Sequence, residues 1–252
     1  MPLLPKLPIV AGESLTSYLN RVALFHFNLG LAELLHAFEI PQHEAMFPLP
    51  KTMERIARMT GYSSDDLSKT AFVKSGSRQR SIGGELVHIE FVDQKTRPFC
   101  PACLLEDIEP DSCSNGMPVG RIEWQVNCVW TCTKHGIILQ APQTKTYADR
   151  FNLMPELSAD KTGLQRAMDD AVDQKPSGLQ KYIMARIEGQ SGPAWLDDQQ
   201  LDLAARACEM LGIVITRGAS VNVNLLISSN GPKLGMLVLI LLAAARRGAG
   251  KD

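Results

Sequence analysis

The sequence has no excess of charge of either sign. Its 252 residues carry 26 Lys and Arg against 27 Asp and Glu, which gives a formal net charge of −1. An overall basic surface for nucleic acid is therefore not indicated, although a local basic patch can still contact phosphates. Hydrophobic residues make up 45% of the chain, which is typical of a folded globular protein rather than a disordered one.

Long apolar runs and targeting signals are also lacking. The longest apolar stretch, residues 234–245, has 12 residues, whereas a membrane-spanning helix needs about 20. Pro2, Pro5 and Pro8 lie where a secretory signal would have its apolar core. We therefore expect a cytoplasmic protein with no membrane partner, whose cysteines stay reduced.

Signatures of common active sites are not found. The sequence has no GxxxxGK[ST] phosphate loop and no Ser/His/Asp set with recognisable spacing. Four histidines have no catalytic partner nearby in the sequence, namely His26, His36, His43 and His88. We expect a protein that acts by holding partners together and is not an enzyme.

Two short motifs combine three of the six cysteines with one histidine. Cys100-Pro-Ala-Cys103 is followed 28 residues later by Cys132-Thr-Lys-His135, so the pattern is CxxC and then CxxH. A two-residue gap lets a tight turn direct both side chains at one ion, and four such ligands suit tetrahedral Zn²⁺. Because four protein ligands leave no open position, we predict one structural zinc ion per chain, held between two hairpin tips.

The other three cysteines have different surroundings in the sequence. Cys128 is a rival ligand, but the apolar/polar alternation over 122–128 predicts a strand that turns Cys128 into a core with Trp124. Cys113 lies in a loop, and Cys208 lies on an expected helix with its side chain in the core.

Helical periodicity dominates the first part of the chain. The pattern predicts a helix after the N-cap Ser14 and a second helix that ends before Pro41. Residues 41–51 are expected to form a loop. Residues 52–72 predict a helix-turn-helix with Gly61 in the turn.

Strands and further helices are expected beyond this point. Residues 73–99 look rich in strand and loop. Amphipathic helices are predicted around 164–168, over 179–187 and over 201–211, the last of them stopping at Gly212. A faint echo of the first helix-turn-helix near Gly212 indicates either a second such motif or an ordinary helix end.

The expected fold class is mainly α with a small β-containing zinc ribbon. We divide the chain into an N-terminal helical domain with the helix-turn-helix (1–95), a zinc-finger module (96–150) and a C-terminal helical region (151–252). The apolar tail, 231–252, is either buried, used in a homodimer, or the product of a disrupted reading frame.

Basic residues concentrate in one part of the chain. Residues 51–80 hold seven basic residues against three acidic ones. The second helix of the helix-turn-helix begins with Asp65 and Asp66 in its first turn, and phosphates would repel these carboxylates. The motif is therefore either a packed or protein-docking hairpin, or a DNA reader. Contacts with DNA phosphates are expected instead from Lys51, Arg55, Arg58, Lys74, Arg78 and Arg80.

Three segments in order carry a resemblance to a known family. They are Gly12-Glu13-Ser14-Leu-Thr-Ser-Tyr-Leu-x-Arg21, Phe99-Cys100-Pro-x-Cys103-Leu-x-Glu-Asp107, and Arg121-x-x-Trp124 followed by Cys132-x-x-His135-Gly136. Over roughly residues 5 to 140 the chain resembles the TniQ family, which includes the N-terminal part of TnsD-type transposition proteins.

The resemblance implies a helical domain with a helix-turn-helix, then a zinc finger whose matching positions are Cys100, Cys103, Cys132 and His135. It also implies a role in choosing the target site for transposition. Such proteins mark a target by binding DNA or by joining a guide-RNA complex, and they engage an AAA+ ATPase that recruits the transposase.

Two other functions stay open from the sequence. One is a zinc-ribbon transcriptional regulator with a helix-turn-helix. The other is a metallohydrolase, in which one motif residue is not a ligand and water completes the zinc shell. Glu106 and Asp107 would be its candidate bases, but we expect them to form a solvated acidic turn.

Overall fold

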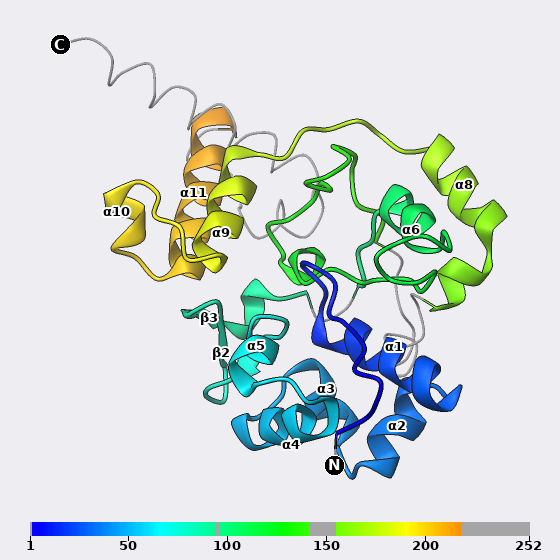
Figure 1. Ribbon diagram of the computed structural model, residues 1–252. Helices are drawn as coiled ribbons and strands as arrows, with labels where there is room; N and C mark the ends of the chain where they lie inside the picture. Colours follow the sequence, from blue (N-terminus) through cyan, green and yellow to red (C-terminus); the bar gives the residue numbers. More distant parts are fainter. Residues whose placement is uncertain (1, 94–95, 142–154, 218–252) are drawn as a thin grey trace.

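The computed structural model describes residues 2–93, 96–141 and 155–217. Within these ranges the chain is largely helical, with one small sheet (Figure 1). The N-terminal helices are α1 (Leu15–Phe27), α2 (Leu31–Ala37), α3 (Gln42–Met46), α4 (Pro50–Thr60) and α5 (Ser64–Ser68). The strands and central helices are β1 (Val73–Lys74), β2 (Gln79–Ile82), β3 (Glu85–His88), η1 (Ile89–Phe91), α6 (Pro101–Asp107) and η2 (Glu123–Gln125). A helical turn at 155–159 precedes α8 (Lys161–Asp169), α9 (Gly178–Ile187), α10 (Ala194–Asp197) and α11 (Leu201–Arg217). Among these helices, none is long and apolar enough to cross a bilayer.

The first two expected helices are confirmed. The Ser14 hydroxyl accepts a hydrogen bond from the Ser17 N–H, which caps α1, and Asn28 ends the helix in the left-handed conformation. The loop expected over 41–51 is wrong, because α3 lies within it and α4 begins at Pro50. Proline fits the first helical position, where no hydrogen-bonded N–H is needed, so its presence does not exclude a helix start.

Two helices, α4 and the short α5, lie in the region of 52–72, with a turn at Gly61 between them. Gly61 ends α4 with φ of 73° and donates its N–H to the Ala57 carbonyl. The Ser63 hydroxyl then caps α5 by accepting from the Asp66 N–H. Leu67 is fully buried and packs α5 into a core formed by residues between Leu7 and Val73.

The expected strands within 73–99 form a three-stranded antiparallel sheet in the order β1-β2-β3. Gly83 and Gly84, both with positive φ, connect β2 to β3, with Ile82 opposite Glu85. Ile82 and Val87 are buried in a second core, which extends along the chain from Phe72 to Cys208.

The strand predicted over 122–128 is wrong. Local hydrogen bonds make Glu123–Gln125 a 3-10 helix, and only Val126 forms an isolated bridge, to Val92. Among the residues that the structure describes, no neighbouring strand forms a ladder along this segment. The expected burial is confirmed, since Trp124 and Cys128 are both in the second core.

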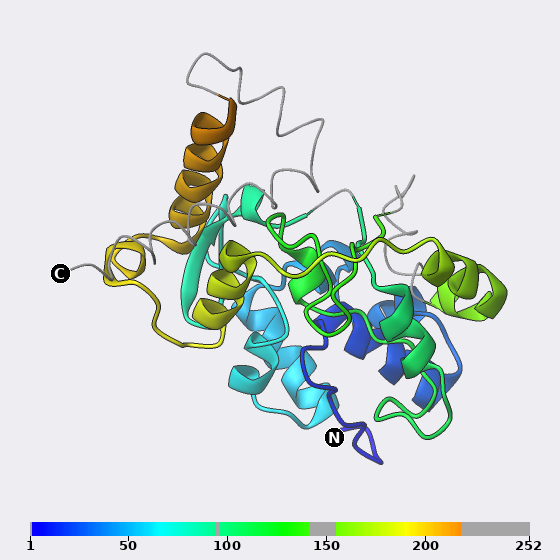
Figure 2. The same ribbon diagram turned by 90° about the horizontal axis from the view of Figure 1, so that it is seen from above.

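The C-terminal helices pack on the same core as the sheet. α8 and α9 are confirmed, but α11 does not stop at Gly212, which is a helical residue followed by the buried Ile213. Gly212 lacks the positive φ of a helix-ending glycine, so a second helix-turn-helix at this point is also wrong. Figure 2 shows the end of α11 rising away from the rest of the molecule.

Buried side chains thus form two clusters. The first belongs to α1–α5, and the second joins the sheet, the cysteine motifs and α8–α11. The domain boundaries at 95 and 150 stay a prediction. The apolar tail over 231–252 lies outside the described residues.

Candidate functional site

The first cysteine motif lies at the start of a helix. Cys100 is the N-cap of α6, Pro101 is the first helical residue, and Cys103 follows in the first turn. The expected hairpin tip is therefore wrong on this side, because Pro101 begins a helix that turns Cys103 back toward Cys100. An isolated bridge between Phe99 and Gln140 holds the entering chain.

The second motif lies in a tight turn between two short extended segments. Thr131 and Ile138 form an isolated bridge, and the Gly136 N–H donates to the Cys132 carbonyl. Gly136 has φ of 63°, a conformation that favours glycine. His135 comes three residues after Cys132, and the turn directs both side chains toward α6.

The four side chains meet in one cluster. The His135 Nδ1 lies 3.4, 3.3 and 3.5 Å from the Sγ atoms of Cys100, Cys103 and Cys132. The Cys103 and Cys132 sulfurs are 3.6 Å apart, and all four ligand atoms lie within 4.8 Å of one another.

These separations fit a single tetrahedral ion. With Zn–S near 2.3 Å and Zn–N near 2.05 Å, a tetrahedron has S–S edges of about 3.8 Å and S–N edges of about 3.6 Å. The three cysteines are buried and the histidine is half-buried. The expected ligand set is brought together as a buried cluster that could hold a metal ion.

The thiols of the cluster influence one another's ionisation. Hydrogen bonds from Cys100 and Cys103 lower the pKa of the Cys132 thiol below its ordinary value. Hydrogen bonds that Cys103 makes to Cys100 and Cys132 raise the pKa of the Cys103 thiol. A divalent cation held here would supply the positive charge that stabilises neighbouring thiolates.

Glu106 orients the histidine of the cluster. Its carboxylate lies 3.1 Å from the His135 Nε2 and accepts a hydrogen bond of 2.6 Å from the Lys134 ammonium. Although partial burial acts in the opposite direction, these two partners lower the pKa of Glu106. An ionised carboxylate on Nε2 leaves Nδ1 as the ligand atom, which is how second-shell carboxylates hold a metal-binding histidine.

The expectation of a solvated acidic turn is wrong for Asp107. This carboxylate is buried and bonded by both terminal nitrogens of Arg121, and it also accepts the Val119 N–H. Spacing alone could not indicate the pairing, because Arg121 comes 14 residues later. The pair ties α6 to the segment that leads into Trp124.

The Gly-Glu-Ser segment is also structural. The Glu13 carboxylate forms a 2.6 Å ion pair with Arg21, and both side chains are almost completely buried. The Ser14 N–H donates to the Gly120 carbonyl, while Glu13 and Arg121 form an isolated bridge. Sequence analysis missed this junction. The occurrence of Glu13, Arg21 and Arg121 in the family-like segments was the only signal.

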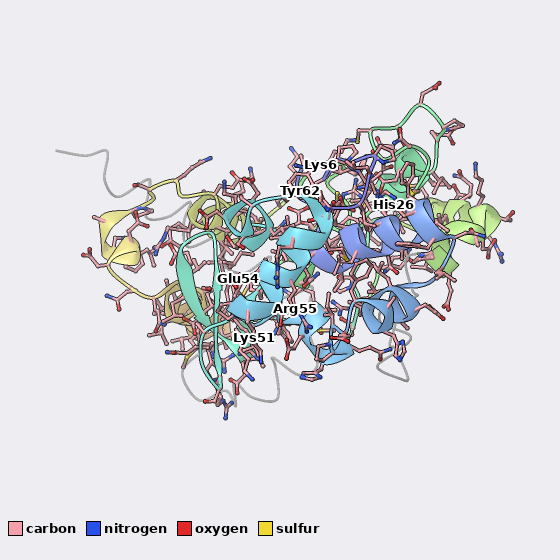
Figure 3. The ribbon with its side chains drawn as sticks, turned by 60° about the horizontal axis from the view of Figure 1, so that its bottom comes forward. Lys6, His26, Lys51, Glu54, Arg55 and Tyr62 are labelled. Atoms are coloured by element: carbon pink, nitrogen blue, oxygen red, sulfur yellow. The ribbon has the colours of Figure 1, made fainter. Side chains whose placement is uncertain are left out.

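Three expected DNA contacts lie on one face of α4. Lys51, Arg55 and Arg58 are exposed at helical spacing, and Figure 3 shows Lys51 and Arg55 on this helix with Glu54. They border a hollow of about 310 Å³ with Pro41. Arg55 pairs with the exposed Glu39, whereas Lys51 and Arg58 form no ion pair within the described chain.

The other three expected contacts lie on the sheet and differ in accessibility. Lys74 is exposed, and Arg78 is exposed but pairs with Glu90. Arg80 is buried, donates to the Gly76 and Gln79 carbonyls and packs over the Phe47 ring. The structure therefore removes Arg80 from the residues that could reach a phosphate.

Comparison with known proteins agrees with the arrangement of these segments. The family model TniQ matches residues 4–139, which is more than half of the chain. No curated protein and no solved structure matches. The matched range contains the Glu13–Arg21 ion pair, helices α4 and α5, and all four residues of the Cys/His cluster. This chain therefore belongs to the TniQ family.

Proposed function

We propose that this protein is a target-selection adaptor for transposition, which holds DNA and a transposition AAA+ ATPase together and whose fold depends on one structural zinc ion. The observation that carries the proposal is the TniQ match over a range that includes the whole Cys/His cluster. A guide-RNA complex in place of direct DNA binding is the alternative route to the target.

Zinc is the metal that the donor set favours. Three thiols and one imidazole nitrogen are soft and borderline ligands, and their spacing suits a tetrahedron. Cys100, Cys103, Cys132 and His135 would hold the ion, and its role would be to fix α6 against the turn that carries His135.

A structural role agrees better with the cluster than a hydrolytic one. Four protein ligands fill a tetrahedral shell, whereas catalytic zinc keeps one position for water. Glu106, which contacts the cluster through His135, is engaged by His135 and Lys134 rather than directed at an open site. We therefore favour the adaptor over the metallohydrolase, and we propose that the protein has no catalytic activity of its own.

The α4 face is the part of the molecule that would contact DNA phosphates. Lys51, Arg55 and Arg58 project from one helix, while α5 presents Asp65 and Asp66 in its first turn. Carboxylates at that position oppose insertion of α5 into a groove. The structure thus supports backbone contacts by α4 rather than base reading by α5, which also makes a sequence-specific regulator the weaker alternative.

Salt dependence of DNA affinity tests this assignment. For three phosphate contacts, log K should fall with log salt with a slope of about −2.7. Replacing Lys51, Arg55 and Arg58 by Gln should weaken binding and make that slope less steep by about 2.7. Lys181→Gln is the control, since this exposed lysine lies on α9. An unchanged slope in the triple variant, measured by fluorescence anisotropy, would exclude α4 as the DNA-binding face.

A further inference from the structure

A cavity opens beside the C-terminal half of α1. Its volume is about 330 Å³, and its lining includes Asn20, Arg21, Leu24, Leu29, Met117 and Pro118. The cavity is therefore bounded by α1, by the start of α2 and by the segment that follows α6. Its size suits one or two large side chains.

Arg21 belongs to the cavity lining, and two of its nitrogen atoms have no hydrogen-bond partner in the described chain. The Nη1 atom of Arg21 is satisfied by the Glu13 carboxylate and the Pro8 carbonyl. The Nε and Nη2 atoms have no hydrogen-bond partner in the described chain, and they are buried, since the side chain is only 1% exposed. Buried N–H groups require acceptors, so an occupant of the cavity should bring an oxygen to Arg21.

The charges around the cavity indicate which kind of oxygen fits. Glu13 already neutralises Arg21, and Glu156 adds a further carboxylate to the lining. A second carboxylate from a ligand would face uncompensated negative charge. A neutral carbonyl oxygen, such as that of a peptide backbone, fits both Arg21 and its surroundings.

Exposed apolar side chains cluster near the cavity. Leu24 and Leu29 are each 46% exposed, Phe25 is 46% exposed and Phe27 is 42% exposed. Phe25 and Phe27 lie on either side of Leu24 around the helix, given 100° per residue. Exposed apolar groups of this density are typical of binding surfaces. A small ligand inside the cavity would leave the phenylalanines in water, whereas a polypeptide segment would cover them.

We infer that this cavity docks an apolar, uncharged segment of a partner protein, with a large apolar side chain in the cavity and a backbone carbonyl on Arg21. The surface is separate from the proposed DNA face. The cavity and the hollow beside α4 have no lining residue in common. The inference does not require that the protein bind DNA.

Selection of peptides on the full-length, zinc-loaded protein tests the inference. A displayed library of random 12-residue peptides serves as the probe. The enriched peptides should share a large apolar residue and contain few acidic residues. Their binding should slow hydrogen exchange over 17–30 and leave the exchange of α4 unchanged. Selection that yields no such peptides, or protection confined to another part of the molecule, would overturn the inference.

A matched pair of variants then locates the binding site. Leu24→Glu should weaken the selected peptides roughly tenfold or more, because it places a charge at the cavity. Leu203→Glu is the control, since Leu203 is an exposed leucine on α11, 56% accessible. Both positions are exposed, so equal melting temperatures should confirm that both variants fold. Equal peptide affinity of the two variants would contradict docking at this cavity. Binding of N-acetyl-leucine amide as tightly as the selected peptides would also contradict it, because this small ligand would leave the phenylalanines in water.

Discussion

The buried ion pair between Glu13 and Arg21 permits a quantitative test of the α1 junction. Arg21→Met retains much of the apolar volume of the side chain but leaves Glu13 without its charge partner. Glu13 would keep only hydrogen bonds from the Val10 N–H and the Ser17 hydroxyl, at 3.0 and 3.1 Å. Removing one partner of a buried pair costs about 3–5 kcal/mol. For a chain of this size that corresponds to a fall in melting temperature of roughly 6–20 °C.

The pH dependence of the destabilisation shows whether the lost interaction is the ion pair with Glu13. Burial raises the pKa of Glu13 above its ordinary value of 4.5, and the charge of Arg21 is the largest opposing influence. Loss of Arg21 should raise that pKa further. A carboxyl group whose folded-state pKa lies above the unfolded value stabilises the fold at low pH and loses this contribution as pH rises. The variant should therefore be more destabilised relative to wild type near pH 7.5 than near pH 5.

Calorimetry of zinc-loaded protein at both pH values measures the effect. Arg78→Met is the matched control, because Arg78 pairs with Glu90 at the surface, where both side chains are mostly exposed. Loss of an exposed pair should cost less than about 1 kcal/mol. If Arg21→Met behaves like Arg78→Met, or if its destabilisation does not change with pH, the buried pair does not hold the junction.

Three further predictions concern the cluster and the turn after α4. The Cys103→Ser variant should lose the metal and unfold the segment around α6, because a structural zinc ion supplies folding free energy on the order of 10 kcal/mol. Circular dichroism should show this loss of helix. It should show no loss for the control Cys113→Ser, whose thiol is exposed. The Glu106→Ala variant should bind the metal about 10- to 100-fold more weakly in chelator competition, because it loses the hydrogen bond to His135. The control Glu109→Ala should keep the wild-type affinity. Equal affinities of the two variants would argue against orientation of His135 by Glu106. Gly61→Ala should cost about 1–2 kcal/mol in urea unfolding, because the residue has positive φ; unchanged stability would contradict the strained turn.

Local signals predicted several helices and the four residues of the Cys/His cluster. The CxxC and CxxH spacings identified a cluster whose atoms the fold places within 4.8 Å. Capping chemistry at Ser14 located the start of α1. These signals are reliable because the interacting residues are only a few positions apart, so the interactions depend little on the rest of the fold.

Features that depend on distant residues could not be predicted. The alternation over 122–128 resembles a strand, but a ladder needs a neighbouring strand, and the fold supplies only Val92. Glycine is common at helix ends, but α11 continues through Gly212 to Arg217, and Ile213 is buried. Arg80 appears in sequence as one more surface charge. Its burial depends on Phe47, more than thirty residues away.

The metal content of purified protein tests the central claim most directly. We predict one zinc ion per chain. X-ray absorption should show three sulfur atoms at about 2.3 Å and one nitrogen atom at about 2.0–2.1 Å from the zinc. Protein that folds without metal, or zinc with a water oxygen in place of one of these ligands, would contradict a closed structural site built from Cys100, Cys103, Cys132 and His135.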